Sequence, residues 1–430
     1  MKSCRHSTIG WLVWLVTGGV CAPAIAEQHQ LPNFVHIMTD DHGWTDVGYM
    51  GYRKVHTPNL DAMAAGGLVF TRFYAPSAVC TPTRVSITMG RHCSRYGVIT
   101  VGGCPVAPFN NPKALPKPPG NITMAEGLKT KGYTTAHVGK AHGGSTRGMD
   151  LVHGYGNASD AQTDVRATDI AVEFIRESVA DKKPFYVRLW LSVAHKKYTP
   201  SQEYLALYPN ELVGGKRKEP AYGYWAEVSL ADDMVGRVRS ALRDLGVAGK
   251  TLLWFSSDNG GCDGHQQGVL RSGKGHLYEG GVRVPAIIEY PAMIKTPRRT
   301  DVPASGLDIL PTMFELAGVP LPDYELDGVS LVPLLRGEMD QRPKAIPFWL
   351  IDSLTKPALR FALVDNRYKL LTNLNDQAED ELYDIPADMA ETKNLAAEHP
   401  KLVARMRDEL QRWKKSVEES MAGKDSKEVR

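Results

Sequence analysis

The chain has 430 residues, a formal net charge of +3 and 23% charged residues of both signs. This length suffices for one large domain and a smaller one, and the balanced charge excludes a basic nucleic-acid-binding surface. None of the six cysteines forms a Cys-x-x-Cys pair, which argues against a cysteine-based zinc site.

Residues 1–26 have the pattern of a secretory signal peptide. Lys2 and Arg5 precede the apolar run IGWLVWLVTGGV, and the following APAIA has the small residues that signal peptidase requires. The run is too short for a membrane span, and no later segment is long and apolar enough for one. We therefore expect cleavage after Ala26 and export to the periplasm or the extracellular space.

From residue 27 to about residue 345, short apolar runs alternate with helical stretches, as in a sheet flanked by helices. The runs NFVHIMTDD, TTAHVGK, PFYVRLWLSVAH and KTLLWFSSDNGG predict strands. Helices are predicted for residues 57–70, the first part of 121–140, 163–178 and 228–246. The fold class is therefore α/β, with a large mixed sheet sandwiched by helices.

After residue 345 the pattern changes. The segments LRFALVDNRYKLLTN and DELYDI predict short antiparallel strands, and residues 399–421 predict an amphipathic terminal helix. We expect an N-terminal domain over 27–345 and a C-terminal subdomain over 346–430 with a smaller antiparallel sheet. The final GKDSKEVR is expected to be disordered.

Polar residues gather at the predicted strand ends, where open α/β sheets bind their ligands. They are Asp40, Asp41, Lys140, His142, His195, Asp258 and Asn259. The sequence therefore predicts a polar site along one edge of the sheet.

The acidic pairs at two of these ends are suited to a metal. Asp40 and Asp41 repel each other unless a cation or a proton compensates them. Asp258 and Asn259 offer oxygen ligands of the kind that calcium and magnesium prefer. Either pair alone could equally well cap a turn, but the two together favour a metal site.

Four basic residues could form an anion pocket beside that metal. Lys140 and His142 are two residues apart, so they can share an extended face. Lys274 stands in a Gly-rich loop, and His195 ends an apolar strand where its imidazole can act as acid or base. Taken singly, each is explained as well by an ordinary structural or solvated residue.

Cys80, in the segment SAVCTPTRVSITMGRH, begins a predicted helix. A disulfide from Cys80 would need a second cysteine, but Cys93 and Cys104 are better matched to each other than to Cys80. A thiol nucleophile needs an adjacent base, and none is local. Pro82 suits the first turn, which places Cys80 near the positive end of the helix dipole with Arg84 one turn on. The positive charge of this arrangement would stabilise a bound anion, or an oxygen nucleophile that attacks a bound anion.

The segments CTPTR and VSITMGRH resemble the signature of the type I sulfatases of the alkaline phosphatase superfamily, Cys-x-Pro-x-Arg followed by Thr-Gly-Arg. Thr83 replaces the more usual Ser or Ala, and Met89 separates Thr88 from Gly90. GYTTAHVGKAH matches the second family signature. TDDHGWTDVG, SSDNGG, KGHLYEGGVRVP and the C-terminal RYKLL, ELYDI and NLA extend the resemblance over nearly the whole chain after the leader.

The resemblance implies that a separate maturation enzyme reads the Cys-x-Pro-x-Arg segment and oxidises Cys80 to Cα-formylglycine. One hydroxyl of the hydrated aldehyde then attacks sulfur in line and displaces the alcohol. Sulfate is expelled as the second hydroxyl loses its proton, which regenerates the aldehyde. A plain Ser or Cys could accept the sulfate but could not release it in this way.

The resemblance also assigns roles. One calcium ion is held by Asp40, Asp41, Asp258, Asn259 and residue 80. Arg84 and Lys140 orient the diol and neutralise developing charge. His142 assists elimination, and His195 and Lys274 contact the sulfate and protonate the leaving oxygen. His195 departs from the family pattern, because Lys196 and Lys197 follow it where a Pro is usual.

A secreted sulfatase that is exo-acting on sulfated carbohydrates is the function that the resemblance implies, with an arylsulfatase on small aryl sulfates as an alternative. A phosphoric ester hydrolase of the same superfamily would require two zinc ions and His-rich ligand pairs, which the sequence lacks. A non-catalytic carbohydrate-binding protein is disfavoured because every polar position expected of a working site is occupied. Candidate sugar contacts, each explained more simply as a solvated loop residue, are Arg147, His265, Gln266 and Arg271.

Overall fold

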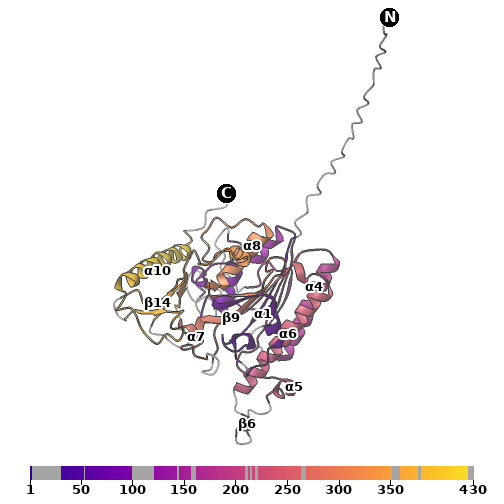
Figure 1. The fold of residues 1–430 in the computed structure, drawn as a ribbon, viewed down its shortest axis with the longest axis horizontal. Coiled ribbons are helices and arrows are strands. Elements are labelled where there is room, and N and C mark those ends of the chain that lie inside the picture. Colours follow the sequence, from indigo (N-terminus) through magenta and orange to yellow (C-terminus); the bar gives the residue numbers. More distant parts are fainter. Residues whose placement is uncertain are drawn as a thin grey trace. The chain divides into compact units, whose positions relative to one another are not determined.

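A large mixed β-sheet organises the chain from Leu31 onward (Figure 1). This computed structural model describes Met1 and residues 31–52, 54–98, 121–142, 145–155, 161–208, 212–213, 216–217, 221–262, 268–350, 359–375 and 379–424. The expected signal peptide after Met1 and the expected disordered tail beyond Lys424 lie outside these residues. Cys104, His265 and Gln266 lie outside them as well.

The described part of the large sheet has nine strands in the order β10-β2-β9-β8-β1-β5-β3-β4, with β11 paired to β2. Their bounds are β1 Asn33–Thr39, β2 Leu68–Tyr74, β3 Thr134–Lys140, β4 Leu151–Tyr155, β5 Phe185–Trp190, β8 Thr251–Ser257, β9 Arg283–Glu289, β10 Arg298–Thr300 and β11 Ala304–Ser305. β1 runs parallel to β5 and β8, whereas β9 is antiparallel to β8 and β2. The predicted mixed α/β sheet is therefore confirmed.

Helices cover both faces of this sheet. One face carries α1 (Pro58–Gly66), α4 (Ala161–Ala180) and α6 (Ala221–Asp244), which lie side by side (Figure 1). The other face carries α2 (Cys80–Met89), α3 (Met124–Lys129), α8 (Ile309–Ala317) and α9 (Val332–Arg336). β1 supplies both apolar layers, because its alternate residues point to opposite faces and all of them are buried.

Shorter elements complete the larger part of the chain. They are η1 Gly48–Met50, η2 Cys93–Tyr96, α5 Gln202–Leu205, β6 Leu212–Val213, β7 Lys216–Arg217, η4 Ala248–Lys250, α7 Glu279–Val282 and η5 Gly306–Asp308. Within the described ranges, none of the helices combines the length and the apolar character that a membrane span requires.

Two predicted elements end earlier than expected. The predicted helix 57–70 ends at Gly66, and strand β2 begins at Leu68. Gly67 approaches β9 so closely that a Cβ there would lie 2.4 Å from the Ile288 carbonyl oxygen, so the chain turns from helix to strand at this point. The predicted strand 184–195 ends at Trp190, which places His195 in a loop.

A second sheet follows in the chain. It is antiparallel, in the order β12 (Ile346–Trp349), β13 (Phe361–Val364), β14 (Tyr368–Thr372) and β15 (Glu381–Asp384). The amphipathic helix α10 (Pro400–Met421) packs its apolar side on β13 and β14 (Figure 1). The predicted smaller antiparallel sheet with a terminal helix is confirmed. The domain boundary at residue 345 stays a prediction.

A buried ammonium joins the second sheet to the first. Lys369 Nζ, on β14, lies 2.9 Å from Glu279 Oε1 and 3.0 Å from Glu391 Oε1, and all three side chains are buried. Glu279 begins α7 and accepts a 3.1 Å hydrogen bond from Tyr74 of β2. Burial opposes ionisation of Glu279, but the charges of Lys369 and of Arg283, which pairs with it at 3.2 Å, together outweigh burial and lower the pKa of this carboxyl. The cluster therefore depends on the lysine.

Lys369→Met should destabilise the protein strongly, because it leaves Glu279 and Glu391 buried without their shared cation. We expect the free energy of unfolding from urea denaturation to fall by about 3–5 kcal/mol. The matched control is Lys393→Met, which removes an exposed ion pair with Glu398 and should change it by less than about 1 kcal/mol. Similar losses in the two variants would contradict a buried cluster that holds the sheets together.

Candidate active site

The acidic pairs predicted from the sequence meet at one edge of the sheet. Asp40 and Asp41 follow β1, and Asp258 and Asn259 follow its parallel neighbour β8. Asn259 Nδ2 donates to Asp41 Oδ1 over 2.7 Å, and the Asp41 backbone N–H donates to Asp258 Oδ1 over 3.3 Å. All four residues are fully buried. The parallel register therefore assembles the predicted four-residue cluster.

Cys80 begins α2 and is buried, with Val79 as its N-cap residue. The neighbouring Thr81 Oγ1 is hydrogen-bonded to His142 Nδ1 over 2.9 Å. His142 follows β3, so a histidine from a distant part of the chain contacts the residue next to the cysteine, which had no local base in the sequence. Burial raises the pKa of the Cys80 thiol. An unmodified cysteine here is therefore a poor nucleophile near neutral pH.

Arg84, one turn after Cys80, bridges the two acidic pairs. Its Nη2 lies 3.0 Å from Asp40 Oδ2 and 2.7 Å from Asp258 Oδ2, and its Nε donates to Asp258 Oδ2 over 3.0 Å. Lys140, the last residue of β3, donates to the same oxygen of Asp40. Burial opposes ionisation of Asp40, but Lys140 and Arg84 outweigh it and lower the pKa of this carboxyl. Burial and the Asp40 charge instead raise the pKa of Asp258 to about 6.

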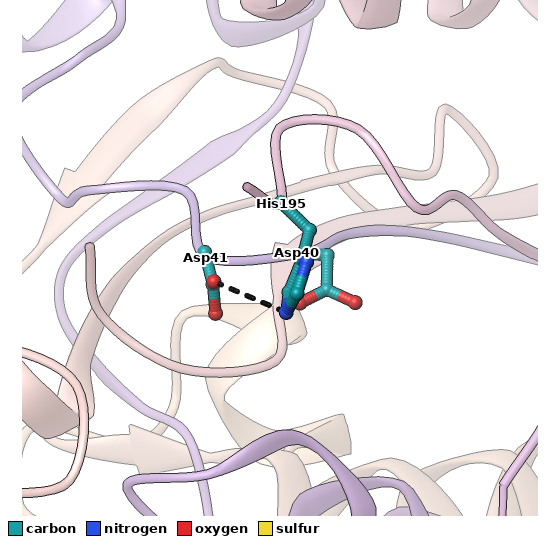
Figure 2. Close-up of side chains that lie close together, drawn as sticks. All are labelled: Asp40, Asp41 and His195. Carbon is teal, nitrogen blue, oxygen red and sulfur yellow. Dashed lines mark ion pairs between the residues drawn. The ribbon is translucent and has the colours of Figure 1, made fainter. Parts of the chain in front are cut away.

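Further polar groups surround Asp41. Lys274 Nζ lies 2.6 Å from Asp41 Oδ1, and His195 Nε2 lies 3.8 Å from Asp41 Oδ2. Figure 2 shows the His195 ring beside both Asp40 and Asp41, with the ion pair to Asp41 dashed. One ligand atom from each of these three residues lies within 4.8 Å of the other two. His195 thus reaches the site from its loop.

Cys262 is a site residue that the sequence analysis did not identify. Its Sγ donates to Asp41 Oδ2 over 2.8 Å, and the side chain is partly buried. No motif marks this cysteine, because its contact with Asp41 joins two residues that are 221 positions apart in the chain.

The oxygen ligands fit a hard cation. Asp40 Oδ1 and Asn259 Oδ1 are buried, and in the described part of the chain neither has a hydrogen-bond partner. Buried acceptors are rarely left unsatisfied, and both belong to the predicted calcium set. The carboxylates of Asp40, Asp41 and Asp258 are balanced by Arg84, Lys140 and Lys274. A bound divalent cation would therefore make the site net positive and attractive to an anion.

The loop that carries His195 is held by two buried carboxylates. Asp164, on α4, accepts hydrogen bonds from the backbone N–H groups of Ser192 at 3.0 Å and Val193 at 2.9 Å. Glu227, on α6, accepts one from the Thr199 backbone over 2.6 Å. The sequence shows these acids only as polar members of helices. Their role in holding the loop depends on which side of α4 and of α6 packs against that loop.

The other sequence candidates have structural partners. Arg147 Nε lies 3.0 Å from Glu126 Oε1, and Arg271 pairs with Glu381 at 3.2 Å while stacking 3.8 Å from the centre of the Tyr278 ring. These contacts favour structural roles over sugar binding. Cys93 is buried, and its pairing with Cys104 stays a prediction because Cys104 is outside the described residues.

Comparisons with known proteins agree with this geometry. The family model described as Sulfatase matches residues 32–319, and the model described as N-sulphoglucosamine sulphohydrolase, C-terminal, matches residues 272–416. Arylsulfatase A of Bos taurus is 32% identical over 76% of this chain and 71% of its own length. N-acetylgalactosamine-6-sulfatase of Sus scrofa is 31% identical over 73% of this chain and 68% of its own length.

A solved structure has the same fold. The crystal structure of the protein named Ps i-CgsB in complex with k-i-k-neocarrahexaose aligns with a TM-score of 0.77, at 24% sequence identity, over 93% of this chain and 94% of that one. The large sheet and the second sheet of this chain therefore have the fold of that solved structure.

Glu227 should make stability depend on pH. Burial raises the pKa of Glu227 from 4.5 to about 8, so the folded state holds this proton more tightly than the unfolded chain. The protonated Glu227 side chain therefore contributes to the free energy of unfolding. This stabilisation is fully present below about pH 4.5 and is lost as the pH rises through about 8. Glu227→Gln removes this titration. At pH 8 we expect the variant to gain on the order of 3 kcal/mol of unfolding free energy relative to wild type.

Urea denaturation of both proteins between pH 4.5 and 8.5 measures this difference. Glu173→Gln, at an exposed position of α4, is the control and should follow the wild-type curve. If wild type and Glu227→Gln show the same pH dependence, Glu227 does not bind its proton more tightly in the folded state.

Proposed function

This chain belongs to the sulfatase family of sulfuric ester hydrolases, and we propose that it is an exported enzyme acting on sulfated carbohydrates through a formylglycine at residue 80. The observation that carries the proposal is the ion pairing of Arg84 with both Asp40 and Asp258 one turn after Cys80. Because Cys80 lies one turn before Arg84 on the same helix, this pairing supports a reactive residue 80 near the acidic cluster. Residues 27–345 would form the catalytic domain and residues 346–430 its C-terminal subdomain.

Calcium is the metal that we propose for the acidic cluster. Asp40, Asp41, Asp258 and Asn259 would hold it together with residue 80, and the two unsatisfied oxygens of Asp40 and Asn259 support this assignment. When bound, the ion supplies positive charge that stabilises the negative charge developing on the ester and the nucleophile.

The cationic side chains would orient the ester. Arg84 and Lys140 lie against Asp40, and Lys274 lies against Asp41, so all three ammonium or guanidinium groups face the acidic cluster. Fixed charges in a buried site stabilise a transition state without reorganising at the moment of reaction. This arrangement suits the sulfuryl oxygens, which carry the charge of the ester.

Residue 80 would provide the nucleophile. The formylglycine hydrate supplies one hydroxyl to attack sulfur and a second whose deprotonation releases sulfate. His142 lies beside this position through its hydrogen bond with Thr81, so it can accept the proton during release. His195 and Lys274 both adjoin Asp41, and their position in the site supports the proposal that they donate a proton to the leaving oxygen.

Sulfated carbohydrate is the substrate class that we propose. Bovine arylsulfatase A is named for aryl esters, whereas the porcine relative is named for a sulfated amino sugar and the solved structure contains a carrageenan-type oligosaccharide. The signal peptide expected at residues 1–26 would deliver the enzyme to extracellular polymers. The acidic cluster and its cations would form the closed base of a substrate pocket, and such a pocket would favour exo action on a single projecting sulfate.

Sulfate release from a substrate panel tests the function. The protein, produced together with a formylglycine-generating maturation enzyme, should release sulfate from sulfated oligosaccharides faster than from nitrophenyl sulfate. Nitrophenyl phosphate should be a poor substrate, because the site residues that the structure describes offer oxygen ligands for a hard cation in place of the paired zinc ligands of phosphatases. Turnover of the aryl sulfate alone would make the protein an arylsulfatase. A preference for the phosphate would overturn the reaction class.

The control is the same protein produced without the maturation enzyme. It should fold normally but be largely inactive, and mass spectrometry of the peptide containing residue 80 should show cysteine instead of the aldehyde. Cys80→Ser should be inactive with either production route. Undiminished turnover by a protein that carries only unmodified cysteine would contradict the formylglycine mechanism.

Metal analysis should find one calcium ion per chain and no zinc. Calcium at 100 times its dissociation constant should stabilise the wild type by about 2.7 kcal/mol, and chelation should reverse this gain. Asp258→Ala should abolish both the activity and the calcium-dependent part of the stability. Asp181→Asn, which alters an exposed ion pair with Lys183, should retain both. Stoichiometric zinc in the wild type would contradict the calcium assignment.

A further inference from the structure

Arg188 is a fully buried cation for which neither the sequence motifs nor the proposed mechanism accounts. It lies on β5, and its side chain is only 1% exposed. In the described parts of the chain, no carboxylate lies within the 4.0 Å that defines an ion pair with its guanidinium. Burying a charge without a counter-charge is costly, so a residue kept only for packing would be better replaced by an apolar one.

The hydrogen bonds of Arg188 reach two segments that carry site residues. Its Nη1 donates to Thr88 Oγ1 over 2.7 Å, and Thr88 Oγ1 donates in turn to the Arg84 carbonyl over 2.8 Å. Its Nη2 donates to the Ser145 carbonyl, and the Ser145 N–H donates to the His142 carbonyl over 3.1 Å. One guanidinium thus links α2, which carries Cys80, to the segment after β3.

Trp190 adds a second link between Arg188 and the site. The guanidinium carbons of Arg188 and Arg84 lie 4.5 Å and 5.4 Å from the centre of the same Trp190 ring. Trp190 Nε1 donates to His36 Nδ1 over 3.3 Å, which leaves the His36 proton on Nε2, 3.1 Å from Ser256 Oγ. The ring is therefore fixed by its own hydrogen bond while both arginines pack on it.

The charge of Arg188 is not offset by its immediate neighbours. His36 on β1 and His137 on β3 are its register partners on the two adjacent strands. Burial lowers the pKa of His36 to about 3 and that of His137 well below its usual value, so both rings are neutral near pH 7. Burial also lowers the pKa of Arg188, to about 10, which still leaves it protonated.

We propose that Arg188 is a positioning residue for sulfate ester hydrolysis. It holds α2, with Cys80 and Arg84, against the segment that bears Lys140 and His142, and its uncompensated charge adds to the positive potential of the sulfate pocket. The inference rests on the proposed function, because it concerns the placement of the groups that perform that reaction. Arg188 itself acts through Thr88, Ser145 and Trp190 and does not touch the substrate.

Two substitutions separate the charge from the geometry. Arg188→Lys keeps the charge but replaces the planar fork, whose two nitrogens bond Thr88 and Ser145 separately, with a single ammonium nitrogen. Arg188→Met keeps much of the side-chain length but loses the charge and both hydrogen bonds. With kcat expressed per folded, aldehyde-bearing chain, Arg188→Lys should lower kcat about 10-fold with little change in KM. Arg188→Met should lower kcat about 100-fold, the effect of misplacing catalytic groups by about 1 Å, and should also raise KM.

The matched control is Arg342→Met. Arg342 is equally buried, but it pairs with Asp308 at 2.6 Å and its other side-chain hydrogen bonds go to the carbonyls of Pro303 and Lys344. This substitution should lower the free energy of unfolding and leave kcat per folded chain unchanged. A loss of stability alone is the behaviour expected of a merely structural arginine.

Normal kcat and KM in both Arg188 variants, with only a loss of stability, would overturn the inference. If Arg188→Met fails to fold, the Arg188→Lys variant tests the inference by itself. A purely structural role of Arg188 predicts that the folded fraction of Arg188→Lys has the wild-type kcat. Failure of the proposed function is distinguishable, because wild-type protein carrying the aldehyde would then release no sulfate from any ester in the panel. This failure would be seen with the wild-type protein alone, without any Arg188 variant.

Discussion

The two-sided ion pair of Arg84 with Asp40 and Asp258 is the interaction on which the rest of the site depends. All three side chains are completely buried, so none of these charges is stabilised by water. Without the guanidinium, two carboxylates from neighbouring strands would face each other in a region of low dielectric, which is strongly unfavourable. Because Cys80 lies one turn earlier on the same helix, the ion pair also determines where the reactive position stands relative to the carboxylates.

The surrounding architecture makes this charge cluster possible. Parallel pairing of β1 and β8 brings their carboxyl ends to one edge, and the helix layers on both faces exclude water from the strands that carry it. Buried polar contacts then place the remaining parts: Asp164 and Glu227 hold the loop of His195, and Lys369 joins the second sheet to α7. These contacts cost desolvation, and their benefit is defined geometry at the site.

The fold was largely predictable, because hydrophobic periodicity reports which faces of a segment are buried. The alternation of strands and helices indicated the mixed sheet, and the short strands after residue 345 indicated the antiparallel one. The errors occurred where apolar character continued past the end of an element. Residues 57–70 divide at Gly66 and Gly67 because the chain there must pass close to the backbone of β9. The strand before His195 ends at Trp190. Leu191 still donates to the Met38 carbonyl of β1, but the residues after it bond to Asp40 and Asp164 and continue no strand.

From the sequence by itself, Cys80 with Pro82 and Arg84 predicted an anion site, and the acidic residues after two strands predicted a hard cation beside it. The resemblance to the sulfatase signature then identified the anion as sulfate. These features are local, so spacing along the chain reports them directly. Only the tertiary structure decided that His142 lies beside Cys80 through Thr81, that Cys262 contacts Asp41, and that Arg188 connects the two segments below the site. Such contacts join residues far apart in the chain. They follow from strand order, register and the side of each helix that is buried, which no short motif encodes.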